Sequence, residues 1–302
     1  MPGQLKEVRS RIQAVTSTQQ ITKAMKLVAA SKLRKAQDRI IQMRPYATKL
    51  FDMMGNILSG TSGNVSIAYA QERSVESVLI VVLTSDRGLC GGFNANVVKL
   101  VKNLLQTKYA NQRTAGKVEL LCIGKKGYEL LRREPNLIIN IDHVDLFTNL
   151  SFDGSISVSE SLLKGFLDKQ FDVVEVVYNQ FKNQITQIPT VEQYLPIEKL
   201  DAPTTTHTPQ EKDKNKPDFI YQPNQQGILE ELVPKILKTR FFRFLLDSNA
   251  SEHGARMTSM DNATTNAEDL LRSLKISYNR ARQAAITTEL TEIVSGAAAL
   301  QG

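Results

Sequence analysis

Residues 251–300 read SEHGARMTSMDNATTNAEDLLRSLKISYNRARQAAITTELTEIVSGAAAL. Apolar and small residues recur there at alternating spacings of three and four: Met257, Met260, Thr264, Ala267, Leu271, Leu274, Tyr278, Ala281, Ala285 and Thr288. A hydrophobic repeat near 3.5 residues keeps one side of a helix against a partner helix, as in a coiled coil. The pattern therefore predicts a coiled-coil helix at the C-terminal end of the chain.

The same repeat extends backward toward residue 227, through Leu229, Leu232, Ile236, Leu246 and Ala250. Polar residues interrupt it, and Gly254 is the one internal position of low helix propensity after Pro234. A helix of about seventy residues, at roughly 1.5 Å per residue, spans on the order of 100 Å. Because the core of one domain is not that deep, we expect the helix at 227–302 to project from the rest of the protein.

A second helix with the same repeat is predicted at residues 1–60. Its seam positions are Leu5, Val8, Ile12, Val15, Gln19, Thr22, Lys26, Ala29, Leu33, Ala36, Ile40 and Met43, continuing to Ala47, Leu50, Met54 and Ile57. Pro45 should kink or restart this helix. Two heptad seams in one chain can cover each other, which favours an antiparallel pair, although a coiled-coil homodimer stays open.

The first helix has two polar features. Gln19, Thr22 and Lys26 occupy seam positions, either as a polar layer that sets the register or because a third surface contacts the pair there. Around them runs a basic belt that consists of Lys23, Lys26, Lys32, Arg34, Lys35 and Arg39. Such a charge run is usually a solvated face, but its bias also predicts an acidic neighbour.

Residues 75–200 alternate between strand and helix patterns. Strands are expected at 78–83, 118–123, 137–141, 173–178 and 185–195, and helices at 94–109, around 128–131 and at 158–167. Continuous β-branched runs such as 78–83 are typical of parallel strands that are buried on both faces. The predicted fold class is α/β: a Rossmann-like central domain with a mostly parallel sheet, plus the terminal coiled coil. Residues 201–226, rich in Pro, Thr and Lys, are expected to form a flexible excursion.

Only one segment of the central domain resembles a site. SDRGLCGGF at 85–93 is a Gly-rich turn between a strand and a helix, where phosphates often bind, but it matches neither G-x-G-x-x-G nor a P-loop. We therefore expect a structural turn with Gly at positive φ and with Asp86 capping the next helix. Asp142 and Asp145 beside His143 indicate a metal site only weakly. No catalytic set, cofactor or metal is predicted.

Composition narrows the class further. The net charge of +7 and the pI near 9.3 favour an acidic partner, whether nucleic acid, anionic lipid or protein. Cys90 and Cys122 cannot build a disulfide framework and are expected to be half-buried thiols of a reducing compartment. The longest apolar run is 78–83, far short of the ~20 residues of a membrane span. The N-terminus has no features of a signal or transit peptide, so an intracellular protein is expected.

Three segments carry a family resemblance. ITKAMKLVAASKLRKAQ at 21–37, TSDRGLCGGFN at 84–94, and EHGARMTSMDNATTNA with YNRARQAAITTELTEIVSGAAAL toward the C-terminus resemble the gamma subunit of F-type ATP synthase. The resemblance covers about half of the chain by motif and nearly all of it by layout. It implies a non-catalytic rotary shaft that couples proton-driven rotation to ATP synthesis on the beta subunits.

The resemblance also implies partners and a location. The partners are the ring of alpha and beta subunits, the epsilon subunit and the membrane rotor ring of c subunits, with no nucleic acid and no membrane span. Six residues match motif positions at which the family contacts the ring, so ring contacts are expected at Met25, Lys26, Arg256, Arg282, Gln283 and Thr287. A bacterial peripheral protein on the cytoplasmic face of the cell membrane is expected. The small, nearly uncharged residues 295–300 suit rotation inside a hydrophobic sleeve.

The sequence departs from the family in two places. Gly254 stands where the family commonly has Ala, and the excursion at 201–226 looks longer than a minimal member needs. The plastid members carry a regulatory cysteine pair, which the positions of Cys90 and Cys122 do not match, so no redox switch is predicted. Two other classes stay open: an α/β enzyme that binds nucleotide at the Gly-rich turn, and a homodimeric coiled-coil adaptor or nucleic-acid binder.

Overall fold

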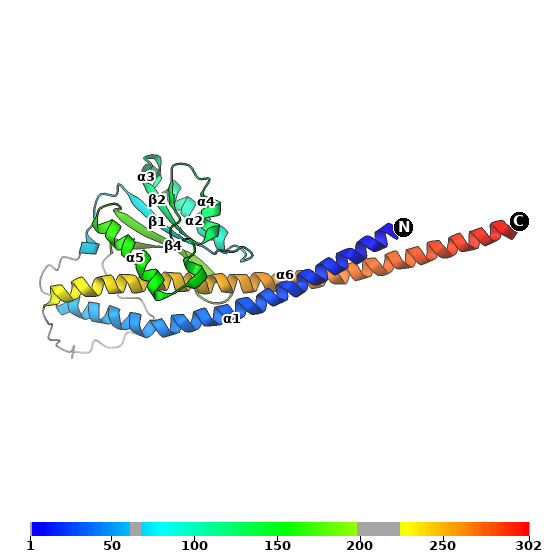
Figure 1. Cartoon of the computed structure of the whole chain (residues 1–302), viewed down its shortest axis with the longest axis horizontal. Coiled ribbons are helices and arrows are strands. Elements are labelled where there is room, and N and C mark those ends of the chain that lie inside the picture. The colour runs from blue at the N-terminus through cyan, green and yellow to red at the C-terminus, as the bar shows by residue number, and fades with distance from the viewer. Residues whose placement is uncertain (1, 61–67, 198–223, 302) are drawn as a thin grey trace. The chain divides into compact units, whose positions relative to one another are not determined.

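The computed structural model describes residues 2–60, 68–197 and 224–301 (Figure 1). Its longest elements are two helices, α1 (Pro2–Gly60) and α6 (Gln225–Gln301). The elements between them are η1 (Ala68–Ala70), β1 (Val78–Leu83), α2 (Phe93–Gln106), α3 (Ala110–Thr114), β2 (Val118–Ile123), α4 (Lys125–Leu131), β3 (Ile138–Asn140), η2 (Leu146–Asn149), α5 (Phe152–Leu167), β4 (Val173–Phe181) and β5 (Gln187–Leu195). The predicted α/β class with long terminal helices is confirmed.

The chain divides into two compact units. One consists of Met1–Ser31 with Arg256–Gly302, and the other is Lys32–Ala255. Each unit therefore takes part of α1 and part of α6, and the second unit also holds the sheet. The predicted excursion at 201–226 lies almost wholly outside the described residues, and the predicted division into domains stays a prediction.

The sheet of the second unit has five strands in the order β3-β2-β1-β4-β5. β1 pairs in parallel with both β2 and β4, β2 pairs in parallel with β3, and only β5 is antiparallel, as the second strand of a hairpin with β4. The mostly parallel sheet is as predicted. The chain leaves β1 toward β2 and later returns to β1's other side with β4, so the strand order reverses beside β1.

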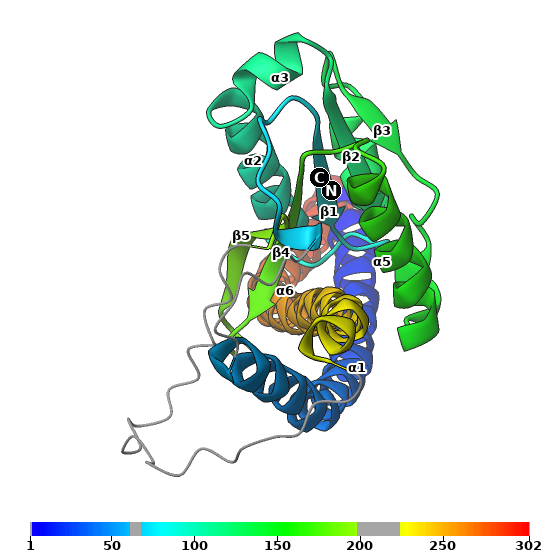
Figure 2. The ribbon, with the colours of Figure 1, turned by 90° about the vertical axis from the view of Figure 1, so that its left-hand side faces the viewer.

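Both faces of the sheet are covered, which explains the continuous apolar strands (Figure 2). In β1, Val78, Ile80 and Val82 join the core under α2 and α4, while the alternate residues Leu79, Val81 and Leu83 join the core under α5 and α6. The period of two follows from the pleat. The second core also takes in Leu50, Met54 and Ile57 of α1, so the helices bind the sheet through their own apolar sides.

In the first unit, α1 and α6 lie antiparallel with the predicted seam between them. The predicted positions from Leu5 to Ala29 and from Met257 to Thr288 are all buried or half-buried, while their neighbours are largely exposed. The seam prediction is therefore confirmed residue by residue. α1 continues as a helix through Pro45, so of the two predicted outcomes the restart is wrong and the kink stays a prediction.

The structure explains why position 254 of α6 is a glycine, which the sequence alone did not show. α6 runs unbroken through it, and a Cβ built at this position would lie 3.1 Å from the main-chain oxygen of Gln184 in the β4–β5 turn. A side chain there would press on backbone. Glycine at this position lets the β4–β5 turn pack closely against α6. This packing accounts for a residue of low helix propensity inside the helix.

Candidate protein-binding site

The polar seam positions of α1 find partners on α6. The hydroxyl groups of Thr22 and Thr264 lie 2.9 Å apart, and the ammonium group of Lys26 donates to Asp261 at 2.5 Å. These contacts favour the interpretation of a polar layer that sets the register. Since the side chains of Lys26 and Asp261 are 33% and 53% exposed, the ion pair adds little stability, roughly 0.2–1 kcal/mol.

The register defines where the pair ends. With Thr22 opposite Thr264 in an antiparallel pair, Leu5 lies opposite Ala281, only a few residues from the start of α1. The rest of α6 therefore extends beyond α1 as a single helix. Several large apolar side chains are exposed on it, from 48% to 67% of their surface: Ile286, Leu290, Ile293 and Val294. Exposed apolar side chains that gather in this way mark interaction surfaces.

The structure places the predicted ring contacts in two groups, all within the first unit. Met25, Lys26 and Arg256 are half-buried near the polar layer, whereas Arg282, Gln283 and Thr287 are exposed near the end of the pair. The hydroxyl group of Thr287 donates to the carbonyl of Gln283 at 2.9 Å. Arg256 and Arg282 are 26 positions apart on one helix, which is roughly 40 Å. A single partner that contacts both groups must therefore extend over about this length.

The outer side of α1 adds apolar surface that the sequence analysis missed. Ile21, Leu27 and Val28 are exposed between 57% and 66%, although none is a seam position. They fall beside Met25 and among the lysines of the basic belt, so this part of α1 combines apolar and positive side chains. The signal was present in the sequence as large apolar residues off the heptad seam, at Ile21, Leu27 and Val28 of α1 and at Ile286, Leu290 and Ile293 of α6.

The Gly-rich turn after β1 is filled by its own side chains. The amide group of Asn94 donates to the hydroxyl group of Ser85 at 2.8 Å and to the sulfur of Cys90 at 3.3 Å, and the Ser85 hydroxyl donates to the carbonyl of Arg87 at 2.7 Å. Gly91 has a φ of 58°, which confirms a turn that needs glycine. These bonds hold the side chains of Ser85, Cys90 and Asn94 together within the turn.

Asp86 does not cap α2, so that prediction is wrong. The N-cap position is Gly92, without a side-chain bond, and a carboxylate oxygen of Asp86 instead accepts from the backbone N–H of Lys125 at 3.3 Å. Asp86 therefore serves the start of α4, because the turn carries it to the neighbouring strand's loop. The sequence distance of 39 residues hid this partner.

The acids around His143 and the two cysteines are the remaining candidates for chemistry. Within the described residues, no three His, Cys, Asp or Glu side chains converge to hold an ion, and Asp145 pairs with Lys125 at 2.8 Å. Cys90 and Cys122 are both free thiols and both fully buried, rather than half-buried as predicted. Burial raises the pKa of Cys122 to about 12, which makes this thiol unreactive.

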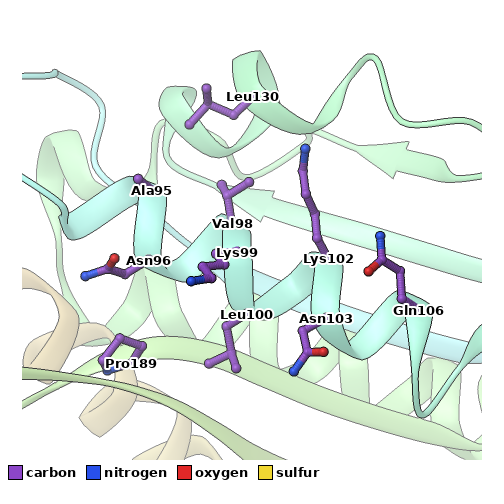
Figure 3. A pocket seen from close by; sticks show the side chains of 10 residues that line it. All are labelled: Ala95, Asn96, Val98, Lys99, Leu100, Lys102, Asn103, Gln106, Leu130 and Pro189. Atoms are coloured by element: carbon purple, nitrogen blue, oxygen red, sulfur yellow. The ribbon is translucent and has the colours of Figure 1, made fainter.

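A shallow hollow of about 870 Å³ follows the outer side of α2 (Figure 3). Its lining includes Lys99, Lys102, Asn96, Asn103 and Leu130, together with Pro189 of β5. The lining contains no acid, histidine or cysteine, and its titratable side chains are those of Lys99 and Lys102.

Comparisons with known proteins connect this geometry to a family. The ATP synthase family model matches residues 4–300. The ATP synthase gamma chain of Cytophaga hutchinsonii is 51% identical over 300 residues, covering 99% of both chains. The chain belongs to the ATP synthase gamma-chain family. A second gamma chain, from Chlorobium phaeobacteroides, is 47% identical over 300 residues with the same coverage.

Solved structures agree with the gamma-chain fold. The chain matches a chain of the central stalk and c-ring of the Tetrahymena thermophila mitochondrial ATP synthase with a TM-score of 0.53 at 25% identity, covering 80% of this chain and 99% of that one. A chain of the Euglena gracilis enzyme gives a TM-score of 0.66 at 19% identity, covering 99% and 95%. No helix among the described residues of this gamma-chain member is long and apolar enough to span a membrane.

Proposed function

We propose that this gamma-chain family member is the central rotary shaft of an F-type ATP synthase, which couples proton-driven rotation to ATP synthesis on the catalytic subunits. The observation that carries the proposal is full-length identity of 51% to a curated gamma chain, in a chain whose terminal helices pair along a continuous seam. A gamma chain is a non-catalytic subunit of a membrane-associated complex. The Gly-rich turn, closed by Asn94, agrees with that role.

The partners follow from the same assignment. The alpha and beta subunits form the ring around the paired helices, and the epsilon subunit and the c-ring bind the sheet-containing unit. Met25, Lys26 and Arg256 serve as one contact group with the ring, and Arg282, Gln283 and Thr287 as the other. The exposed apolar residues of the single helix at 286–294 support a hydrophobic sleeve around it. We place the complex at the cytoplasmic face of a bacterial membrane, with this chain peripheral.

The physical logic is differential contact. A shaft with an uneven surface presents different side chains to each catalytic subunit as it turns, so its angle shifts their affinities for nucleotide. The described surface is uneven in this sense: α1 exposes Ile21, Leu27 and Val28 beside the basic belt, while the end of α6 is apolar. Lys26, paired with Asp261, keeps a partly exposed charge at this position.

A cross-link within the shaft tests whether its two helices turn together. Thr22→Cys with Thr264→Cys should form an intrachain disulfide on oxidation, because the native hydroxyl oxygens are 2.9 Å apart. ATP hydrolysis by the assembled complex should be unchanged, since a shaft that rotates as one body does not shear at this layer. Gel mobility and ATPase activity are measured before and after oxidation.

Thr22→Cys alone is the matched control and should give no intrachain bond. A loss of hydrolysis that appears only in the oxidised double variant, and that a reductant reverses, would show that the two helices move against each other. The proposed shaft would then be wrong as a rigid coupling element.

A further inference from the structure

One carboxylate in the second unit accepts hydrogen bonds from three side chains on two other elements. Glu192 of β5 accepts from the hydroxyl group of Tyr178 on β4, from Arg240 of α6 at 3.3 Å and from Arg243 of α6 at 3.2 Å. The side chains of Glu192, Arg240 and Arg243 are only 22–35% exposed. Since charge-assisted bonds of this kind gain strength away from water, Glu192 ties the β4–β5 hairpin to α6.

Among the described residues, the same cluster holds one unsatisfied donor and one acid that makes no ion pair. The Nε atom of Arg243 is buried without a hydrogen-bond partner among the described residues. Asp247, four residues later on α6, is half-buried and makes no ion pair within the described parts of the chain. Side chains four apart on a helix are neighbours, so the carboxyl group of Asp247 can reach the free edge of the Arg243 guanidinium.

We propose that Arg243 is a proton-controlled clamp, which binds Glu192 alone when Asp247 is protonated and is shared with Asp247 when that carboxyl group is ionised. The groups that face Asp247 are Arg44 from α1, Glu192 from β5 and Arg243 from its own helix, while Tyr178 of β4 faces Glu192. Two acids thus compete for one guanidinium group. The clamp controls how firmly the hairpin holds α6.

The direction of the pH effect follows from burial. Burial raises the pKa of Asp247 to about 6, with Arg243 opposing and Glu192 reinforcing the shift. A carboxyl group whose pKa is raised in the folded state contributes stability that is complete below its unfolded pKa of about 4 and lost as the pH rises through about 6. The clamp is therefore tight in mild acid and looser above neutral pH.

Hydrogen exchange of the full chain tests the clamp. Protection factors of the β4–β5 amides are compared at about pH 5 and about pH 8, on either side of the pKa of Asp247 and corrected for intrinsic exchange rates. We expect the wild type to lose protection at the higher pH, by at most about a hundredfold, since the shift is about two pKa units. Asp247→Asn cannot ionise and should stay protected at both pH values.

Two further variants isolate the cause. Asp38→Asn removes an exposed carboxyl group of α1 and should keep the wild-type pH response. Glu192→Gln weakens the acceptor itself and should leave the hairpin poorly protected at both pH values. Equal protection of the wild-type β4–β5 amides at both pH values would overturn the proposal. So would a loss of protection at the higher pH, as large as that of the wild type, in Asp247→Asn or in Glu192→Gln.

Discussion

Gly124→Ala should strongly destabilise the sheet-containing unit. Gly124 follows β2 with a φ of +100°, a conformation that side chains rarely adopt, and a Cβ there would lie 2.1 Å from the carbonyl oxygen of Thr84. Neither the oxygen nor the helix that begins at Lys125 can move away cheaply, because Thr84 also binds the backbone N–H of Gly127. Strain and overlap together should lower the free energy of unfolding by more than about 3 kcal/mol. This is a large part of the roughly 5–15 kcal/mol that is typical of a folded protein.

The effect is measured as the urea midpoint and as protease resistance of the sheet. Gly88→Ala is the matched control: it lies in the turn after β1, no heavy atom would meet its Cβ within 4 Å, and the change should cost less than about 1 kcal/mol. Equal stability of the two variants would contradict the described close approach of β1 and the β2–α4 turn.

Phe244→Ala should destabilise the same unit by about 3–5 kcal/mol. Phe244 is fully buried on α6, with its ring centroid 4.9 Å from that of Tyr178 on β4 and 6.4 Å from that of Tyr194 on β5. Removing the ring leaves a cavity where the long helix binds the sheet. Urea unfolding followed by circular dichroism measures the loss.

Phe152→Ala is the matched control, because it removes the same side chain from a more exposed position. Phe152 is 40% exposed and contacts Phe242 edge to face, so its removal should cost far less than that of Phe244. If both changes cost the same, Phe244 is not the buried anchor between α6 and the sheet.

The parts of the fold that have a regular hydrophobic pattern could be predicted from the sequence. Every predicted seam residue from Leu5 to Ala29 is buried or half-buried, because a period near 3.5 residues keeps one side of a helix against its partner. The strands were equally clear, since runs such as 78–83 are buried on both faces. The site residues were placed only by resemblance, and their contacts with partners stay predictions.

Interactions between distant residues could not be predicted. Asp86 was assigned to the nearest helix start, yet it serves α4, because strand order rather than sequence distance decides which loops meet. Gly254 looked like a local weakness until Gln184 was seen against it. Nothing in the sequence pointed to Asp247 beside Arg243, since its role depends on which strand packs over α6.

Co-purification tests the shaft assignment most directly. A tagged chain is isolated from its native membranes under mild detergent, and the proteins that accompany it are identified and assayed for ATP hydrolysis. The account predicts alpha, beta and epsilon subunits in assembly proportions, with c subunits and with ATPase activity in the eluate. A folded, abundant chain that arrives alone, as a homodimer or with nucleic acid would contradict it.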